Sequence, residues 1–390
     1  MSVYIQNIEC QVPDNSYSQA FLMDKLKGRL KGSKRTNRLI DRIYKESGID
    51  KRHSVIADLD AFYGTSNGEA RTTPTTKCRN DLFTKAGRQM FIDLGQKVVE
   101  RCDNVLYSDI THLIVVSCTG FFNPGPDYEI INALGLDKTV QRYSIGFMGC
   151  YGAFPALRLA QAICQSDQNA TVLIVAVELC TLHAQLKEDL DSILGSAIFA
   201  DGGAAVVVST KPPLVGQPVL EMEHFESTLI PDSEADMAWI IGNSGFEMVL
   251  SQYVPKIIES NISEIIEPIL NKQGMTISDI DHWAIHPGGK AILDKIESAL
   301  NLGNRLEAPR SVLRQYGNMS SATILFVLKE ILQRRSNGIS ESVLSMAFGP
   351  GLTVEVGFLR KQTAKLTQEK GFEPNRDDLL SEQDIELVET

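Results

Sequence analysis

The amino-acid sequence predicts an α/β fold in which strands and helices alternate in layers. Short continuous apolar runs, which are typical of buried strands, occur at 112–118, 171–177 and 204–208. Segments with helical character lie between and around them, at 79–103, 127–134, 149–162 and 192–199. The alternation of these two kinds of segment is what predicts the layered fold.

The second half of the chain repeats the plan of the first. We expect further strands at 282–285, 342–348 and 352–359, and further helices at 290–300 and 319–332. Segments 199–207 and 348–356 both have the composition of a small-residue hairpin that leads into a strand, which is a weak sign of internal duplication. We therefore divide the chain into halves at 1–220 and 221–360, followed by an acidic tail at 361–390.

Composition excludes several classes of protein. The 390 residues are 43% hydrophobic, which indicates a folded chain with a large core. There are 38 Lys and Arg against 49 Asp and Glu, a net charge of −11, which argues against nucleic-acid binding. The longest apolar runs are much shorter than the roughly 20 residues that cross a bilayer. The first ten residues lack a basic region followed by an apolar one, so we expect neither a secretory signal nor membrane insertion.

The seven cysteines favour a reducing compartment. They stand at positions 10, 78, 102, 118, 150, 164 and 180. Their number is odd and no pair has the C-x-x-C spacing, so a disulfide framework or a zinc ribbon is not expected. We expect a cytoplasmic protein in which one cysteine does chemistry while others are small buried apolar residues.

A strongly basic segment stands out within the acidic chain. From Lys25 to Arg52 there are eleven Lys or Arg residues against Asp41, Glu46 and Asp50, a local charge of +8 (eleven minus three). One interpretation is the solvated face of a helix. The other is a landing surface for a small polyanion such as a nucleotide phosphate.

Cys150 is the strongest candidate for a nucleophile. It lies in Phe147-Met-Gly-Cys-Tyr-Gly-Ala153, where small residues permit a tight turn and an apolar helix follows. A cysteine at a helix N-terminus faces aligned N–H groups, which favour the thiolate over the thiol. The alternative is a small buried cysteine at the start of a helix.

His286 ends an apolar strand and opens into Pro-Gly-Gly289. A strand end that leads into a glycine-rich loop is where α/β proteins place working side chains. The alternative is a structural histidine. His282 lies four residues earlier, but no H-E-x-x-H motif and no acidic third ligand accompany the pair, so we expect no metal.

Asn318 lies in Tyr316-Gly-Asn-Met-Ser-Ser-Ala322, just before a predicted helix. It could simply cap that helix, or it could aim an amide at a developing oxyanion. Cys150, His286 and Asn318 at three strand-to-helix junctions could together form a Cys–His–Asn site for acyl transfer. No P-loop, no GxGxxG after a strand and no G-x-S-x-G elbow is present.

With these motifs in order, the sequence resembles the type III polyketide synthases, the chalcone synthase-like branch of the thiolase fold. The resemblance covers roughly residues 1–360 and rests on four motifs at matching spacing. They are Gly149-Cys150, His286-Pro-Gly-Gly289, Tyr316-Gly-Asn-Met-Ser-Ser321 and Phe348-Gly-Pro-Gly-Leu352. Some positions depart from the plant pattern and look bacterial, among them Trp239 and Ala347.

The resemblance implies a thiolase-like fold in which duplicated βαβαβαββ halves form a five-layered αβαβα arrangement. It also implies a homodimer with no acyl carrier domain and no cofactor, since CoA thioesters are the substrates. An acyl-CoA primer would load its acyl group onto Cys150, which His286 would hold as a thiolate by ion pairing. Malonyl-CoA would then lose carbon dioxide, and His286 and Asn318 would stabilise the enolate that attacks the acyl-cysteine.

The resemblance also implies the walls of the substrate cavity. Phe199 matches one gatekeeper phenylalanine between the CoA tunnel and the cavity, and Met248 falls at a second gatekeeper position. Further cavity-lining positions are Cys118, Thr119, His183, Trp239, Ser320 and Phe348. Bacterial relatives often take fatty acyl-CoA and form alkylpyrones or alkylresorcinols, so we expect a pyrone or resorcinol-type product.

For CoA itself, the family uses Lys and Arg from a helix near the N-terminus. Arg42 matches one such position, while the other two are Leu39 and Glu46 here. The substitutes available nearby are Lys45, Arg38 or Arg35. Gly288 and Gly289, in the loop after His286, complete the expected CoA contacts.

Two other functions stay open at this point. One is a condensing enzyme like ketoacyl synthase III, which also pairs Cys, His and Asn but accepts an acyl carrier protein. The other is a thiolase-fold hydrolase that loads an acyl group from CoA onto Cys150 and releases it to water. Product analysis separates both from a polyketide synthase.

Overall fold

The computed structural model describes residues 1–64, 73–335 and 340–363. Its main feature is a nine-stranded sheet in the order β11-β12-β13-β8-β1-β7-β6-β4-β5. The first half of the chain contributes β1 (Tyr4–Gln11), β4 (His112–Ser117), β5 (Gln141–Gly146), β6 (Thr171–Leu179) and β7 (Asp201–Ser209). The second half contributes β8 (Pro218–Leu229), β11 (His282–Ile285), β12 (Ser340–Gly349) and β13 (Thr353–Thr363).

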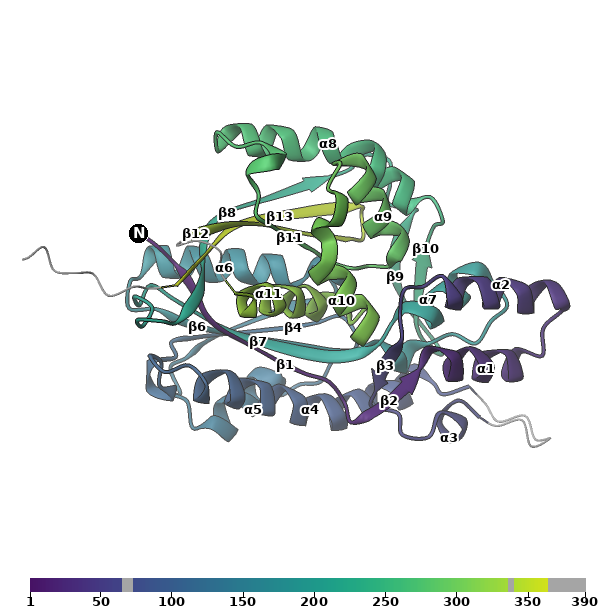
Figure 1. Cartoon of the computed structure of the whole chain (residues 1–390). Helices are drawn as coiled ribbons and strands as arrows, with labels where there is room; N and C mark the ends of the chain where they lie inside the picture. Colours follow the sequence, from purple (N-terminus) through teal and green to yellow (C-terminus); the bar gives the residue numbers. More distant parts are fainter. Residues whose placement is uncertain (65–72, 336–339, 364–390) are drawn as a thin grey trace, which may run out of the picture.

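The sheet is folded over, so that it supplies two of five layers (Figure 1). It bends where β1 meets β8, which pair over only two positions, Tyr4 with Glu221 and Ile5 with Leu220. One outer layer holds α4 (Thr76–Glu100) and α5 (Pro126–Leu134), and the other holds α8 (Val254–Lys272) and α9 (Lys290–Ala299). The central layer holds α6 (Ala153–Ser166) and α11 (Thr323–Gln333), with α10 (Glu307–Tyr316) beside them. The predicted αβαβα arrangement is confirmed.

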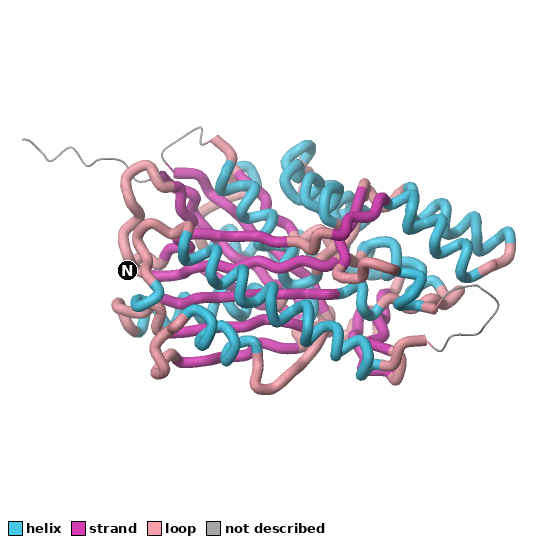
Figure 2. Tube along the Cα trace, turned by 90° about the horizontal axis from the view of Figure 1, so that it is seen from below, coloured by secondary structure: helices cyan, strands magenta, loops and turns pink. Residues whose placement is uncertain are grey.

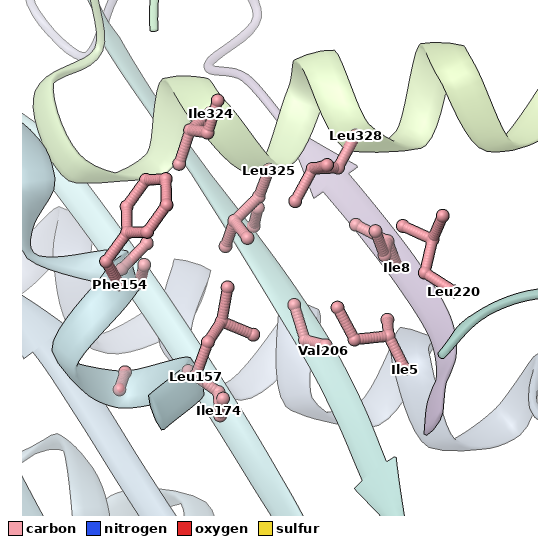
Figure 3. Close-up of a cluster of buried hydrophobic side chains, with 14 of the residues drawn as sticks. Ile5, Ile8, Phe154, Leu157, Ile174, Val206, Leu220, Ile324, Leu325 and Leu328 are labelled. Carbon is pink, nitrogen blue, oxygen red and sulfur yellow. The ribbon is translucent and has the colours of Figure 1, made fainter. Parts of the chain in front are cut away.

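The alternation of side chains along the strands explains the layers. In β6, Ile174 belongs to the central apolar cluster and Val175 to the outer cluster beneath α4 and α5. The same strand is therefore apolar on both faces, which is why its sequence is one continuous apolar run. Figure 3 shows the central cluster, where Leu157 of α6 and Leu325 of α11 approach Val206 of β7.

The two halves of the chain have similar strand directions. β4 pairs in parallel with β5 and β6, and β11 pairs in parallel with β12, while the remaining ladders of the large sheet are antiparallel. The two halves differ in one element. Within the described residues, the second half has no strand at the place of β5, because Asn318 instead forms a single bridge with Phe199 of the first half.

Two small two-stranded sheets and the basic segment lie at one end of the large sheet (Figure 2). In one of them β2 (Asn15–Ser18) pairs with β3 (Lys51–Ser54), with the basic segment between the two strands in the chain, and the other is the hairpin of β9 (Met237–Gly242) and β10 (Gly245–Leu250). The basic segment forms α1 (Gln19–Leu30) and α2 (Lys34–Lys45), which pack with α7 (Leu190–Ile198) around a small apolar cluster. A short helix, α3 (Leu59–Tyr63), follows. Short 3₁₀ turns include η2 (Gly149–Tyr151), η3 (Cys180–His183) and η6 (Ser320–Ala322).

One predicted boundary differs slightly from the structure. The tail was expected from residue 361, but β13 continues to Thr363, since Lys361 is buried and bonds the carbonyl of Arg334 at 2.7 Å. The rest of the predicted tail lies outside the described residues, and the half boundary at 220 stays a prediction. None of the described helices has the length and apolar character needed to span a membrane.

Candidate active site

Cys150 lies in a turn that only glycines permit. Gly149 has a φ of +77°, and a Cβ at this position would come within 2.4 Å of Pro350. Likewise, a Cβ on Gly349 would come within 2.4 Å of the ring of Tyr151. The Gly-Pro-Gly loop after β12 therefore packs directly on the η2 turn that carries Cys150. This explains why two glycine motifs about 200 residues apart in the sequence are both needed.

Asn318 faces Cys150 from the second half of the chain. Its Nδ2 lies 3.9 Å from the Sγ of Cys150 and donates to the carbonyl of Gly288 at 3.3 Å. Its Oδ1 accepts the N–H of Ser320 at 2.8 Å, at the start of η6. Asn318 thus bonds the backbone two residues further on and presents its amide to the sulfur, but it is not the N-cap residue, since Met319 holds that position in η6 and makes no side-chain cap bond.

His286 is 1% exposed and follows directly after β11. Its backbone N–H donates to Met346 of β12 at 2.8 Å, which fixes its position at the end of the sheet. Both ring nitrogens are buried and have no hydrogen-bond partner among the described residues. A buried imidazole with free nitrogens is available to a bound substrate.

One small cavity of about 50 Å³ brings these three residues together. The predicted residues that line it, besides the three, are Phe199, Met248, Cys118, Thr119, Trp239, Ser320, Phe348 and Gly288. His183 does not line this cavity but a larger neighbouring one of about 300 Å³. Gly289 precedes α9 and lines neither.

The two cavities meet at a common wall. Cys180, Phe199, Trp239 and Met248 line both of them. Trp239 is fixed in place because its Nε1 donates to the carbonyl of Cys118 at 2.8 Å. These four side chains form what we call the neck between the small and the large cavity.

Comparison with known proteins identifies the family. Residues 4–212 match the model of the N-terminal domain of chalcone and stilbene synthases, and residues 221–363 match the C-terminal domain. The chain belongs to the chalcone and stilbene synthase family. Its fold is thus that of the type III polyketide synthases, as the sequence motifs predict, while the catalytic roles of Cys150, His286 and Asn318 stay a prediction.

Individual relatives of this family align with nearly the whole of this chain. A probable polyketide synthase 1 of Dictyostelium discoideum is 31% identical over 369 residues, covering 92% of this chain. The chain spans only 11% of the length of that protein. Among solved structures, the C-terminal type III polyketide synthase domain of Steely1, a type I/III hybrid from Dictyostelium, is 29% identical with a TM-score of 0.83. It aligns over 93% of this chain and 100% of the domain.

A bacterial synthase of this family is equally similar in structure. The 1,3,6,8-tetrahydroxynaphthalene synthase of Streptomyces coelicolor A3(2) is 27% identical with a TM-score of 0.82. The alignment covers 93% of this chain and 100% of that one. Both alignments thus extend over nearly all of this chain and all of the matched chains.

Burial favours the uncharged forms of the synthase's two central groups. It raises the pKa of the Cys150 thiol to about 11, against the lowering effect of the contacts with Ser320 and Asn318. Burial also lowers the pKa of the His286 imidazole to about 3. The thiolate–imidazolium pair expected from the family therefore stays a prediction, because each charge in isolation is disfavoured in this dry site.

His183 is held as a wall residue of the large cavity. The carbonyl of Thr119 can only accept, so the Nε2 of His183 donates to it at 2.7 Å. The Nδ1 then accepts the N–H of Phe246 at 3.0 Å. Burial lowers the pKa of His183 to about 4, and its ring stacks on Phe246 at 4.1 Å. These contacts fix one neutral tautomer.

Glu178 is a buried acid of the site that the sequence motifs do not indicate. Its carboxylate accepts the N–H of Cys118 at 3.0 Å and the hydroxyl of Thr119 at 2.8 Å, and it also binds Ser321 beside η6. Burial raises its pKa to about 7. The position could be found from the sequence, since a carboxylate that follows directly on the apolar run 171–177 is unusual.

The basic segment is divided between surface and cavity. Arg42 and Lys45, the residues predicted to bind CoA, form exposed ion pairs with Glu46 and Asp41 and line neither cavity. Three other basic residues of the segment line the large cavity, namely Lys25, Arg29 and Arg52. The role of Arg42 and Lys45 toward CoA stays a prediction.

Proposed function

We propose that this enzyme catalyses iterative decarboxylative Claisen condensation of malonyl-CoA onto an acyl-CoA primer. The observation that carries the proposal is the convergence of Cys150, His286 and Asn318 on one small cavity, with the amide of Asn318 at 3.9 Å from the sulfur. A thiol nucleophile beside two hydrogen-bonding groups is what acyl transfer through a thioester requires.

In the first step the neutral His286 takes the proton of the Cys150 thiol as the sulfur attacks the primer thioester. CoA leaves with the proton, and the acyl group stays on Cys150. A neutral imidazole with free nitrogens suits this role, because it can accept a proton at the moment of attack. The dry surroundings then favour the uncharged acyl-enzyme over the separated charges.

In the second step malonyl-CoA loses carbon dioxide, and the electron pair of the broken carbon–carbon bond forms an enolate. The oxygen of this enolate takes hydrogen bonds from the Nδ2 of Asn318 and from the N–H of His286. The enolate carbon attacks the acyl-cysteine, and the sulfur of Cys150 leaves and is free to receive the extended chain. Donors that are fixed before the reaction lower the barrier without further reorganisation.

We infer a fatty acyl or similarly long primer, with closure of the product to a pyrone or resorcinol. The small cavity of about 50 Å³ has little room for a growing chain, whereas the neck joins it to a cavity of about 300 Å³. The large cavity has Leu22, Leu26 and Leu59 among its lining residues, which suit an alkyl tail. The volume of this cavity then limits the length of the primer's alkyl chain.

We also propose a homodimer in the cytoplasm. β5 is the last strand of the sheet, so one of its edges is open, and it leads through Phe147 to Cys150. Phe121 beside it is 46% exposed and packs against the ring of Phe147 at a tilt, with the ring centroids 5.6 Å apart. Pairing of two copies along β5 would cover this edge. All seven cysteines are free, which suits a reducing compartment.

The proposed function is tested with a panel of acyl-CoA primers, labelled malonyl-CoA and mass spectrometry of the products. The proposal expects products that carry two or more labelled units and a preference among long primers. Release of the free primer acid without consumption of malonyl-CoA would indicate a hydrolase instead. A single extension that requires an acyl carrier protein would indicate a ketoacyl synthase.

A further inference from the structure

Arg52 is a buried cation whose hydrogen bonds go to uncharged groups. It stands in β3, is 4% exposed, and makes no ion pair with any residue that the structure describes. Its Nε donates to the Oε1 of Gln19 at 3.0 Å, and its Nη1 donates to the carbonyl of Phe199 at 2.6 Å. Burial lowers the pKa of Arg52, while Tyr44 and the buried Asp201 act in the opposite direction. Burying a cation that makes no direct ion pair costs free energy, so a role beyond stability is worth testing.

The acceptor of Arg52 belongs to the neck. Phe199 lines both cavities, and its backbone directly follows α7. The residues on either side of it hold Asn318, because Ile198 accepts the N–H of Asn318 at 2.9 Å and Ala200 donates to its carbonyl at 2.8 Å. Arg52 therefore binds the middle residue of segment 198–200, whose two outer residues bond the backbone of Asn318.

A second contact ties Arg52 to the same place. A Cβ on Gly317 would lie 2.9 Å from the Cγ of Arg52 and 3.0 Å from its Cδ, so the alkyl stem packs directly on this glycine. Gly317 has a φ of +74° and immediately precedes Asn318. Arg52 thus contacts both chain segments that meet at Asn318, through its guanidinium on one side and its stem on the other.

We propose that Arg52 is a positioning residue of the condensation, which holds Phe199 and Gly317 so that the amide of Asn318 stays in place beside Cys150. This inference rests on the proposed function. A lysine could not replace it, because one ammonium lacks the rigid fork that reaches Gln19 and Phe199 together. The expected effect is on the geometry of the enolate step and not on the chemistry of the thiol.

The test compares Arg52→Lys with Arg79→Lys. Arg79 is a matched control, since it is also fully buried without an ion pair among the described residues and binds the backbone carbonyls of Pro74, Leu182 and Ala184. We expect Arg52→Lys to lower kcat for malonyl-CoA decarboxylation on the order of 10²-fold, as small misplacements of catalytic groups do. KM for the primer should change less than kcat, because Arg52 lines the large cavity but is only 4% exposed. Arg79→Lys should lower thermal stability but leave kcat per active site unchanged.

A second measurement does not depend on activity. Hydrogen exchange of the amides of Ala200 and Asn318 should be faster in Arg52→Lys than in wild type, because both report the bonds that Arg52 supports. If Arg52→Lys does not fold, Gln19→Met serves instead: it removes the acceptor of the Arg52 Nε, together with the bonds that the Gln19 amide donates to Ser47 at 3.0 Å and to the Ala197 carbonyl at 2.7 Å. We expect a smaller change in the same direction.

The outcomes separate this inference from the proposed function. A wild-type enzyme that makes no polyketide refutes the proposed function, whatever the exchange data show. An active wild type whose Arg52→Lys variant keeps kcat and amide protection overturns the positioning role. Equal losses of kcat in Arg52→Lys and Arg79→Lys also overturn it, since they would reflect only the loss of a buried guanidinium.

Discussion

The amide nitrogen of Asn318 lies 3.9 Å from the sulfur of Cys150, although the two residues come from opposite halves of the chain. Each stands at a short 3₁₀ turn, η2 or η6, that precedes a central helix. The duplicated fold brings these two turns together between the layers. The site is therefore a product of the duplication, and its parts serve different steps of the proposed reaction.

Replacement of Cys150 should separate loading from decarboxylation. Cys150→Ala removes the nucleophile, so no acyl group should be found on the protein by intact-mass spectrometry after incubation with primer. Cys150→Ala or Cys150→Gln should still decarboxylate malonyl-CoA, because His286 and Asn318 remain. Cys164→Ala, a buried cysteine of the central cluster, is the control and should load normally. Product formation by Cys150→Ala at the wild-type rate would refute the mechanism.

Loss of the Asn318 amide should slow condensation. Asn318→Ala removes a donor to the enolate oxygen, and we expect kcat to fall by roughly 10²-fold or more. The rate at which the condensation product forms is measured by chromatography at a saturating concentration of primer. Asn261→Ala, on α8, is the control and should keep kcat, since among the described residues its side chain bonds only the carbonyl of Ile257. An unchanged rate in Asn318→Ala would mean that the side chain serves only to bond the backbone N–H of Ser320 at the start of η6.

Trp239 should set which primers fit. Trp239→Gly widens the neck, so bulkier or longer primers should gain kcat/KM relative to short ones, on the order of 10-fold. Competition between two acyl-CoA primers, read by mass spectrometry, measures the ratio. Trp239→Phe keeps most of the bulk but loses the bond to the Cys118 carbonyl, and it should resemble wild type. Identical primer ratios in wild type and Trp239→Gly would show that the neck does not select.

Glu178 should make stability depend on pH. Burial raises the pKa of its carboxyl to about 7 from an ordinary value of 4.5, so the folded state holds the proton more tightly than the unfolded state. Between these values, rising pH removes that advantage, and wild type should lose stability relative to Glu178→Gln. Urea unfolding of both proteins from pH 4 to pH 8 measures the difference in their free energy of unfolding. The pH at which this difference changes should match the pKa of Glu178 to about one pH unit.

Asp60, an acid whose pKa is shifted in the opposite direction, is the control for this pH dependence. Ion pairs with Lys25 and Arg29 lower the pKa of Asp60. Its contribution is present above the ordinary pKa of Asp and is lost as pH falls. Wild type should therefore lose stability relative to Asp60→Asn at low pH, not at neutral pH. A difference between wild type and Glu178→Gln that stays constant with pH would contradict the assignment.

The sequence predicts best the strands that are buried on both faces. β4, β6, β7 and β12 are continuous apolar runs, and their positions follow from the sequence within a few residues. β5 is an edge strand with exposed polar positions, so no apolar period marks it. α8 contains Pro268 in its interior, which argues against a helix until its apolar face is seen against the sheet.

For the site, glycine motifs identify the residues that need special turns, and tertiary contacts identify the rest. Cys150 follows Gly149, whose positive φ the turn requires, and His286 precedes a Pro-Gly-Gly run, so the local sequence of both is distinctive. Arg52 is one of eleven basic residues in its segment, and nothing in the sequence separates it from those that stay in solvent. Only the fold shows that this guanidinium is the one bound to Phe199.

The most direct test of the account is to follow the acyl group on Cys150 during one round of synthesis. Enzyme loaded with a single acyl-CoA primer is mixed with labelled malonyl-CoA, quenched at short times and examined by mass spectrometry of the Cys150 peptide. The account predicts that the bound acyl group grows in successive two-carbon, labelled steps. Release of the unextended primer acid, with the labelled malonyl-CoA intact, would contradict it.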